Sequence, residues 1–198
     1  MKRSTAILVA LMMLLALAGC NAKKPAADVT TTTATSEKGH QSDAEKARGY
    51  YYYEAIFLDI DAVKSAFRQA EPNHPKYDHT PPEYHVTTAF QPEEKHTSLY
   101  GTKVTVHIIG YTSGKVQRED GAGESMNEGF LVEVSSDNEE MQALLDSCEK
   151  VWHITGSYSA EGYYTEFLDW SKATPMDITL TGTFGGADSD ENFFTTPE

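Results

Sequence analysis

Cysteine and positive charge are both scarce in this chain. Of its 198 residues only Cys20 and Cys148 are cysteines, which leaves no framework of disulfide bonds to hold a fold together. The 16 lysine and arginine residues face 30 acidic ones, giving a formal net charge of −14 at pH 7. Binding to long nucleic acid depends on a basic stripe that neutralises phosphates, so no such partner is expected. A small anion held in one local pocket is compatible with this charge balance.

Long apolar runs are absent after the first twenty residues, so no later segment is long enough to span a bilayer. The one marked run, Ala6 to Ala18, is short, follows Lys2 and Arg3, and ends in Leu17-Ala18-Gly19-Cys20. This segment resembles a bacterial lipoprotein signal with its lipobox. The resemblance implies that residues 1–19 are a signal peptide removed before Cys20, whose thiol is then diacylated. The alternative is an ordinary secretory signal that ends near a cysteine.

The mature chain is therefore expected to be extracytoplasmic and attached to the bacterial membrane through its lipid. Asn21 would not hold it at the inner membrane, so in a Gram-negative source the outer membrane is expected. Residues 20–48 have almost no large apolar side chain and predict a flexible linker with a reach of roughly 30 Å. Residues 187–198 predict a loose acidic tail, in which Phe193 and Phe194 are candidates to dock on the domain.

Residues 49–186 are long enough for one domain with its own core, and the same order of elements is predicted in it twice. Each half has a strand, an apolar helical stripe, a strand with a histidine and an outer alternating strand. In the first half these are Tyr50–Ile60, Ala62–Ala70, the strand of His85 and Lys103–Gly110. In the second half they are Gly129–Val134, a helix capped by Asp137 and Glu140, the strand of His153 and Asp177–Gly182. Cys148 falls on the second helical stripe, which favours a buried structural thiol over a nucleophile.

The histidine strands share a short motif, Tyr84-His85-Val86-Thr87 and Trp152-His153-Ile154-Thr155. On a strand this spacing sends histidine and threonine to one face and the apolar residue between them to the other. An imidazole exchanges a proton near neutral pH and a hydroxyl donates to a phosphoryl oxygen, so two such faces could enclose a phosphate. The alternative is a solvated sheet face. His40-Gln41-Ser42 and His96-Thr97-Ser98 match the same pattern but lie in polar stretches.

The repeated motif in equivalent positions resembles the two-histidine (2H) phosphoesterase superfamily, closest to the cyclic phosphodiesterase and tRNA-ligase-like branch. Glu83 to Thr87, Leu99-Tyr100-Gly101 and Trp152 to Gly156 carry the resemblance. It implies an α+β, bilobal domain with two pseudo-symmetric antiparallel sheets and helices on the outside. It also implies metal-independent hydrolysis of a small cyclic phosphate such as a 2′,3′-cyclic nucleotide, without a cofactor. His85, Thr87, His153 and Thr155 would line the site, with His153 as general base and His85 as general acid.

Several residues outside the two motifs also have side chains suited to a functional role. Tyr158, Tyr163 and Tyr164 follow the second motif and are candidates to stack on a nucleobase, whereas Tyr50 to Tyr53 are expected to enter the first strand. His74, Asp78 and His79 have metal-ligand side chains, but their proline-rich segment predicts an irregular loop. Gly121-Ala122-Gly123 predicts a turn. The chain is expected to be a monomer, and the alternative to an enzyme is a non-catalytic lipoprotein that binds a ligand or partner.

Overall fold

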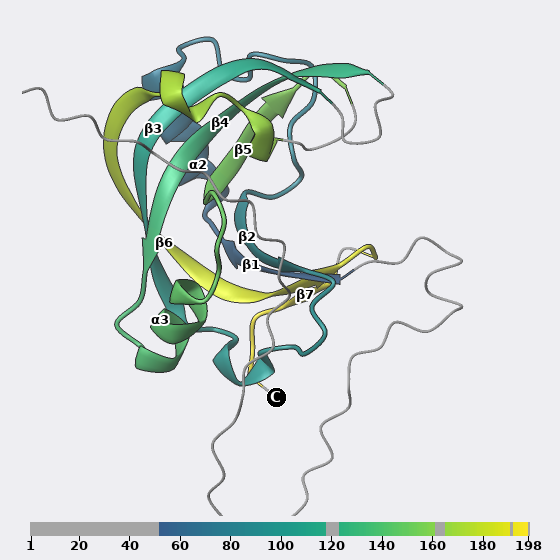
Figure 1. The fold of residues 1–198 in the computed structure, drawn as a ribbon, viewed down its shortest axis with the longest axis vertical. Helices are drawn as coiled ribbons and strands as arrows, with labels where there is room; N and C mark the ends of the chain where they lie inside the picture. The colour runs from purple at the N-terminus through teal and green to yellow at the C-terminus, as the bar shows by residue number, and fades with distance from the viewer. Residues whose placement is uncertain (1–51, 118–122, 161–164, 191, 198) are drawn as a thin grey trace, which may run out of the picture. The chain divides into compact units, whose positions relative to one another are not determined.

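In a computed structural model, the described residues are 52–117, 123–160, 165–190 and 192–197. They form an α+β domain with a seven-stranded antiparallel sheet and two α-helices, which confirms the predicted class (Figure 1). The signal peptide, Cys20, the linker, Tyr163 and Tyr164 lie outside the described residues. Among the helices of the described part, none is both long and apolar enough to cross a membrane.

The elements follow the predicted repeat. The first half has β1 (Tyr52–Phe57), α2 (Ile60–Ala70), β2 (His85–Phe90), the short turn η1 (Thr97–Leu99) and β3 (Lys103–Gln117). The second half has β4 (Glu124–Ser135), α3 (Glu139–Asp146), β5 (His153–Tyr158), the turns η2 (Thr165–Phe167) and η3 (Trp170–Lys172), and β6 (Thr174–Asp188). A last short strand, β7 (Phe193–Phe194), pairs with β6. The order strand, helix, motif strand, outer strand therefore occurs twice.

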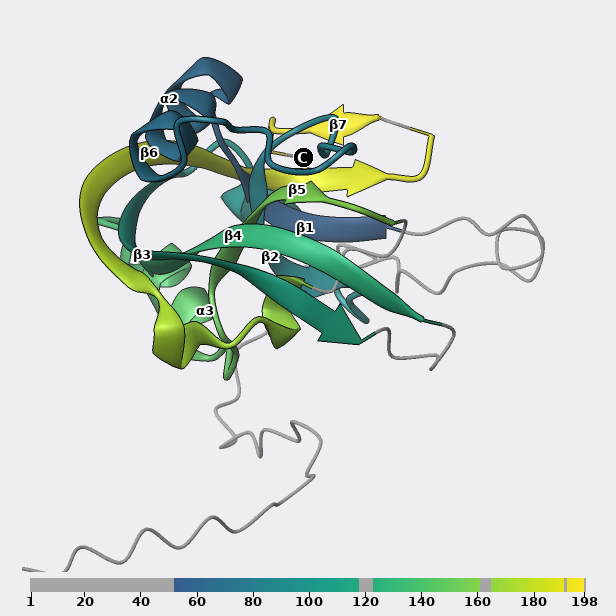
Figure 2. The same cartoon turned by 90° about the horizontal axis from the view of Figure 1, so that it is seen from above.

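The order of strands in the sheet has a twofold relation. Neighbours run β2-β1-β6-β3-β4-β5, and exchanging each strand for its counterpart in the other half gives the same order in reverse. Within the described residues these strands make one continuous sheet rather than two separate ones. The long strands β3, β4 and β6 curve strongly, so that the two end strands β2 and β5 approach each other without pairing (Figures 1 and 2). The strands that carry the two histidine motifs are therefore the ends of the sheet.

Both helices pack on one hydrophobic core. From α2 the residues Val63, Ala66 and Phe67 are buried, and the Phe67 ring stacks on Phe130 of β4 at a centroid distance of 4.0 Å. Met141 of α3 belongs to the same core cluster. Burial of these apolar side chains is the main contribution to the stability of the domain.

Two helix starts differ from the predicted ones. The first strand ends at Phe57 and not at Ile60, because the side chain of Asp59 accepts a hydrogen bond from the Ala62 amide and begins α2. The cap of α3 is Asn138 rather than Asp137, since its side chain accepts from the Met141 amide at 2.9 Å. In both cases a short polar side chain next to the predicted boundary makes the capping bond.

The outer strands are longer than the predicted segments. β3 continues seven residues past Gly110, beyond a register shift between Ile108 and Gly110. Such irregularities break the period-two pattern by which a strand is recognised in sequence. β6 likewise continues to Asp188, and β7 folds back on it, placing the ring of Phe193 edge-on to Phe57 at 5.4 Å. Phe193, one of the two tail residues expected to dock on the domain, thus contacts the end of β1.

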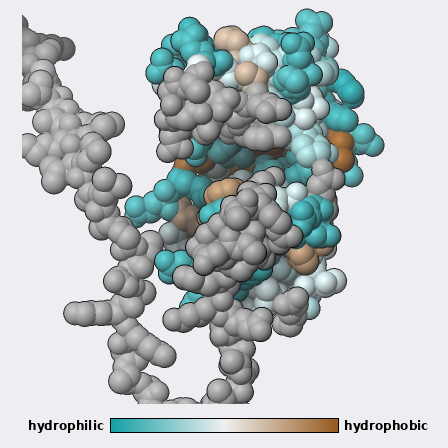
Figure 3. Space-filling view, turned by 90° about the vertical axis from the view of Figure 1, so that its right-hand side faces the viewer, coloured by the Kyte–Doolittle hydropathy of each residue, from teal (hydrophilic) through white to brown (hydrophobic). Residues whose placement is uncertain are grey.

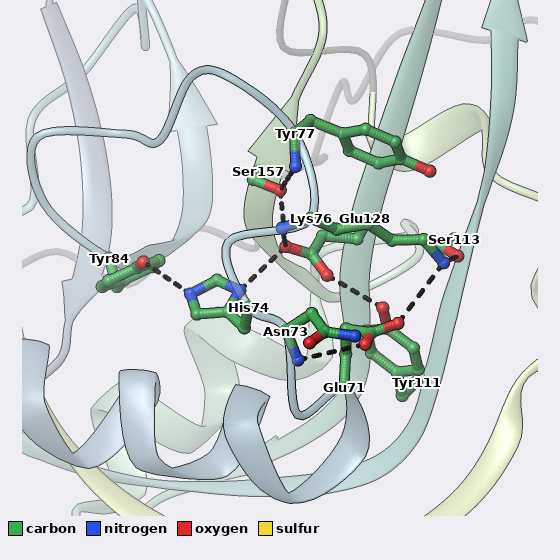
Figure 4. Close-up of polar contacts among 10 residues, drawn as sticks. All are labelled: Glu71, Asn73, His74, Lys76, Tyr77, Tyr84, Tyr111, Ser113, Glu128 and Ser157. Carbon is green, nitrogen blue, oxygen red and sulfur yellow. Dashed lines mark hydrogen bonds and ion pairs between the residues drawn. The ribbon is translucent and has the colours of Figure 1, made fainter.

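A buried carboxylate ties the second half of the sheet together. Glu128 of β4 is fully buried, and its Oε1 accepts hydrogen bonds from His74 Nδ1 at 2.8 Å and Ser157 Oγ at 2.5 Å. Oε1 also accepts a longer bond of 3.3 Å from the Lys76 amide, and Oε2 accepts from the Tyr111 hydroxyl at 2.8 Å (Figure 4). These donors come from the α2–β2 loop, β3 and β5. The Glu128 cluster therefore fixes the loop that leads into β2 against the strand that carries His153.

The first half has a corresponding buried carboxylate. Glu54 of β1 is fully buried and accepts from the His96 amide at 2.6 Å, His96 Nδ1 at 2.8 Å and the Tyr100 hydroxyl at 3.0 Å. Tyr100 also contacts the Tyr52 hydroxyl. This Glu54 cluster attaches the loop that leaves β2 to the strand beside β2. Each motif strand is therefore adjacent to a loop held by a buried glutamate.

Candidate functional site

The histidine and threonine of both motifs line a single pocket. Val86 and Ile154 are 1% and 0% exposed and pack in the core, so their neighbours on each strand face the other way, as the alternation predicts. The pocket has a volume of about 380 Å³, and its described lining residues are Tyr53, Pro81, Pro82, Glu83, His85, Thr87, Phe90, His153 and Thr155. Figure 3 views the side on which β2 and β5 approach each other, where hydrophilic and hydrophobic residues are interspersed on the described surface.

The two motifs have the same register against their neighbouring strands. In β2, His85 lies opposite Phe57 and Thr87 opposite Ala55 of β1. In β5, His153 lies opposite Leu131 and Thr155 opposite Gly129 of β4. Because side chains in equivalent register project from equivalent faces, the pocket receives one histidine and one threonine from each half of the repeat. This places together the four residues predicted as the site.

His153 has a defined tautomer in its neutral form. Its Nδ1 lies 3.0 Å from the carbonyl oxygen of Val151, which can only accept, so Nδ1 donates and Nε2 keeps a lone pair. Burial lowers the pKa of His153 below 6.5, and the positive charge of Lys150 adds to this, while the Val151 carbonyl and Glu166 oppose the shift. The free pocket therefore holds His153 with an acceptor nitrogen at neutral pH.

His85 has a stronger preference for the neutral form. Burial, and to a smaller extent the charge of His153, lower its pKa to about 4, although the backbone of Glu83 partly offsets them. Its Nδ1 is 3.8 Å from Glu83 Oε1, and within the described part of the chain this buried nitrogen has no hydrogen-bond partner. A buried polar atom without a hydrogen-bond partner is uncommon in a folded domain.

Aromatic and charged groups complete the pocket. The Tyr53 ring lies 5.1 Å from the imidazole of His85, and its hydroxyl donates to Glu83 Oε1 at 2.7 Å. Phe90 is 64% exposed at the end of β2. Lys150, in the segment before β5, reaches across to donate to the backbone carbonyl of Thr87 at 2.8 Å. A cation thus connects the two end strands beside the pocket.

Several predicted candidates lie elsewhere. Tyr158 is buried and stacks on His79 with centroids 5.5 Å apart, and it is not among the residues that line the pocket. The side chain of His74 belongs to the Glu128 cluster and stacks on Phe67. Among the described residues no group of three histidine, cysteine or acidic side chains is arranged to hold a metal ion. Cys148 is a free thiol that follows α3, half-buried, with Sγ 3.4 Å from the Leu144 carbonyl oxygen.

Sequence reasoning missed the residues that surround the motifs. Tyr53, Glu83 and Phe90 line the pocket, and Lys150 connects its two strands, but none of them was singled out as a site residue. A signal for the buried carboxylates was present. Glu54 stands three residues before Phe57, the cross-strand partner of His85, and Glu128 stands three residues before Leu131, the cross-strand partner of His153. The segments match: Glu54-Ala55-Ile56-Phe57 and Glu128-Gly129-Phe130-Leu131.

Comparisons of this chain with protein-family models, with curated proteins and with solved structures found no match.

Proposed function

We propose that this protein is a metal-independent phosphodiesterase that hydrolyses a small cyclic phosphate such as a 2′,3′-cyclic nucleotide, on a bilobal domain of the 2H type. The observation that supports it is the single pocket lined by His85, Thr87, His153 and Thr155, which come from equivalent positions on two strands of a repeat. Opening a cyclic phosphate needs a base for water, an acid for the leaving oxygen and donors for the phosphoryl oxygens. Two imidazoles and two hydroxyls supply these groups.

The two histidines are given the roles that the resemblance to the 2H family implies. His153 is the general base, because the Val151 carbonyl holds Nδ1 as donor and leaves Nε2 to take a proton from water. His85 is taken as the general acid by analogy with the 2H family, and the Glu83 carboxylate 3.8 Å from its Nδ1 would partner the imidazolium once bound phosphate favours its protonation. Water oxygen attacks phosphorus, the bond from phosphorus to the ribose oxygen breaks, and His85 gives its proton to that oxygen. Thr87 and Thr155 donate to the non-bridging oxygens.

An anion in the pocket would make these roles possible near neutral pH. Both imidazoles favour the neutral form in the free pocket because burial disfavours the charged form. A phosphodiester brings one negative charge, which favours protonation of a nearby histidine. Bound substrate would therefore favour protonation of one of the two histidines, and the other, if neutral, would accept a proton from water.

The same proposal places the enzyme outside the cytoplasm. The lipobox at Leu17 to Cys20 would attach it to the bacterial membrane by lipid, and the linker of residues 20–48 would hold the domain away from the head groups. A small phosphorylated compound is then its partner, and the domain acts as a monomer.

The experiment is an assay of the purified chain against 2′,3′-cyclic nucleotides in the presence of EDTA. His85→Ala and His153→Ala should each lower turnover by about 10²- to 10⁴-fold, and Thr87→Ala by less, since one hydroxyl supplies one of several phosphate contacts. The matched control is His107→Ala, a histidine of β3 that pairs with Asp177 at 2.8 Å and does not line the pocket. It should leave turnover unchanged.

Full activity of either pocket variant would contradict the proposal. Activity that disappears in EDTA and returns with zinc or manganese would instead show a metal-dependent reaction. A wild-type protein that binds these nucleotides without hydrolysing them would be the non-catalytic ligand-binding lipoprotein.

A further inference from the structure

The two strands that carry the histidine motifs are attached to each other near opposite ends of β5. Within the described residues, β2 and β5 do not pair in the sheet. At the end of β5, the His79 amide of the α2–β2 loop donates to the Tyr158 carbonyl at 3.0 Å, and the Tyr158 amide donates back at 2.9 Å. Before the start of β5, Lys150 Nζ donates to the Thr87 carbonyl of β2 at 2.8 Å. These contacts act on the separation of the two motifs.

The ammonium group of Lys150 contacts one residue of each motif. Besides the carbonyl of Thr87 in the first motif, it lies 5.2 Å from the ring centre of Trp152 in the second, within range of a cation–π interaction. The next residue, Val151, supplies the carbonyl that lies 3.0 Å from His153 Nδ1. Two consecutive residues thus hold the first motif and orient the histidine of the second.

The backbone of β2 is irregular where Lys150 binds. Thr88 is an extra residue in the ladder with β1, because the pairing skips from Thr87 to Ala89. Such a bulge disrupts the ladder locally and turns neighbouring groups away from their regular direction. The sulfur of Cys148 lies 4.0 Å from the Thr88 carbonyl oxygen. The segment before β5 therefore packs against the backbone carbonyls of the bulge, directly after the histidine of the first motif.

The bond from Lys150 has no equivalent in the other half of the repeat. Lys150 stands three residues before His153, and the residue three before His85 is Pro82. A proline side chain has no hydrogen-bond donor, so the first half cannot hold the second in the same way. One lysine therefore serves both halves.

We propose that Lys150 is a positioning residue that fixes the separation of the two motifs, and hence of His85 and His153, for the proposed reaction. An acid and a base must reach opposite sides of one phosphorus atom, and a misplacement of about 1 Å can cost about 10²-fold in rate. Lys150 is not among the described residues that line the pocket, so it acts through the strand that it holds. This role rests on the proposed function, because it requires a reaction that uses both histidines at once.

Kinetics of Lys150→Met on 2′,3′-cyclic nucleotides test the positioning. In this variant kcat should fall about 10- to 100-fold while KM changes less than about threefold, because each motif keeps its own phosphate contacts and only their alignment is lost. Lys150→Arg, which can still donate to a carbonyl, should keep kcat within about threefold of wild type. Lys103→Met is the matched control and should leave kcat unchanged. Lys103 also donates between strands, to Thr183 Oγ1 at 2.7 Å, but β3 and β6 are already paired.

Salt separates the bond from a direct effect of the ammonium charge on the substrate. Raising the ionic strength from about 0.1 M to about 1 M shortens the Debye length from about 10 Å to about 3 Å. The ratio of kcat between wild type and Lys150→Met should stay the same within about twofold, because a short hydrogen bond is screened little. A ratio that falls to about one at high salt, wild-type kcat in Lys150→Met, or a Lys150→Arg variant as slow as Lys150→Met would each overturn the positioning role.

Hydrogen exchange tests the attachment without any reaction. In Lys150→Met the amides of β2 should exchange about tenfold faster, since the strand loses one of its attachments, whereas those of β3 and β4 should keep their rates. Unchanged exchange in β2 would overturn the role of Lys150 even in an active enzyme. A chain that hydrolyses nothing in any form, yet shows the faster exchange, retains the attachment and loses the enzyme, and with it the positioning role.

Discussion

Replacing Glu128 by Gln should destabilise the domain by about 3 kcal/mol. The carboxylate accepts from three side chains, His74, Ser157 and Tyr111, at 2.5 to 2.8 Å, and no part of it is exposed to solvent. A hydrogen bond to a charged acceptor contributes about 1 kcal/mol more than a neutral one, so losing the charge weakens three bonds by about that amount each. A domain of this size has a free energy of unfolding of about 5–15 kcal/mol, so the loss is a large fraction of it.

The pH dependence gives the same prediction a second readout. Burial by itself raises the pKa of Glu128, but the hydrogen bonds from His74, Ser157, Tyr111 and the Lys76 amide outweigh it and lower the pKa below the ordinary 4.5. A carboxylate with a lowered pKa in the folded state stabilises the fold above its unfolded pKa and loses this contribution as the pH falls through the folded pKa. The difference in free energy of unfolding between wild type and Glu128→Gln should therefore be constant at neutral pH and become smaller below about pH 4.5.

Urea denaturation followed by tryptophan fluorescence measures both effects. Glu133→Gln is the control, because Glu133 lies on the same strand with its side chain 71% exposed, and it should change the free energy of unfolding by less than about 0.5 kcal/mol. Glu54→Gln, in the other cluster, should resemble Glu128→Gln. Two results would refute the proposed role of the Glu128 cluster. One is a urea midpoint of unfolding for Glu128→Gln equal to that of wild type, and the other is a difference in free energy of unfolding that stays constant down to pH 3.

Three further predictions concern catalysis, packing and anchoring. Burial lowers the pKa values of both His85 and His153 below 6.5 in the free pocket. For the proposed reaction, kcat/KM should therefore peak below pH 6.5 and fall at higher pH, because the general acid loses its proton. A pH–rate profile with its maximum above pH 7.5 would refute this. Gly156→Ala should cost about 1–3 kcal/mol in thermal unfolding, since a Cβ there would lie 2.6 Å from a buried phenylalanine ring, whereas Gly114→Ala, with its nearest atom at 3.9 Å, should be nearly neutral. Cys20→Ala should release the protein from membranes, and recovery of the unaltered protein wholly in the soluble fraction would contradict the lipid anchor.

The repeat, and the equivalent positions of the two histidine motifs within it, could be predicted because they depend on local patterns. Period-two alternation indicates which face His85 and Thr87 occupy, and the matching order of elements indicates that His153 has an equivalent place. Helix starts were missed where the capping residue, Asp59 or Asn138, is one position from the expected boundary. Local propensity alone does not decide between neighbouring polar side chains.

The rest of the site depends on contacts between distant segments. Glu83 and Tyr53 meet across 30 residues of sequence, and Lys150 bonds to a carbonyl 63 residues away. No periodicity encodes such pairs, because each side chain by itself fits a solvated position. Buried Glu128 is the extreme case, since a glutamate in a strand is ordinarily exposed and only its partners from three other segments make its burial possible.

The strand order implies that the two halves of the chain have exchanged a strand. The half of the sheet that contains β1 and β2 is completed by β6 from the second repeat, and the half that contains β4 and β5 is completed by β3 from the first. A single repeat is therefore incomplete, and two copies would have to lend each other a strand to form a sheet. The fold thus has the form of a domain-swapped homodimer joined into one chain, and separately expressed halves should associate with each other rather than fold alone.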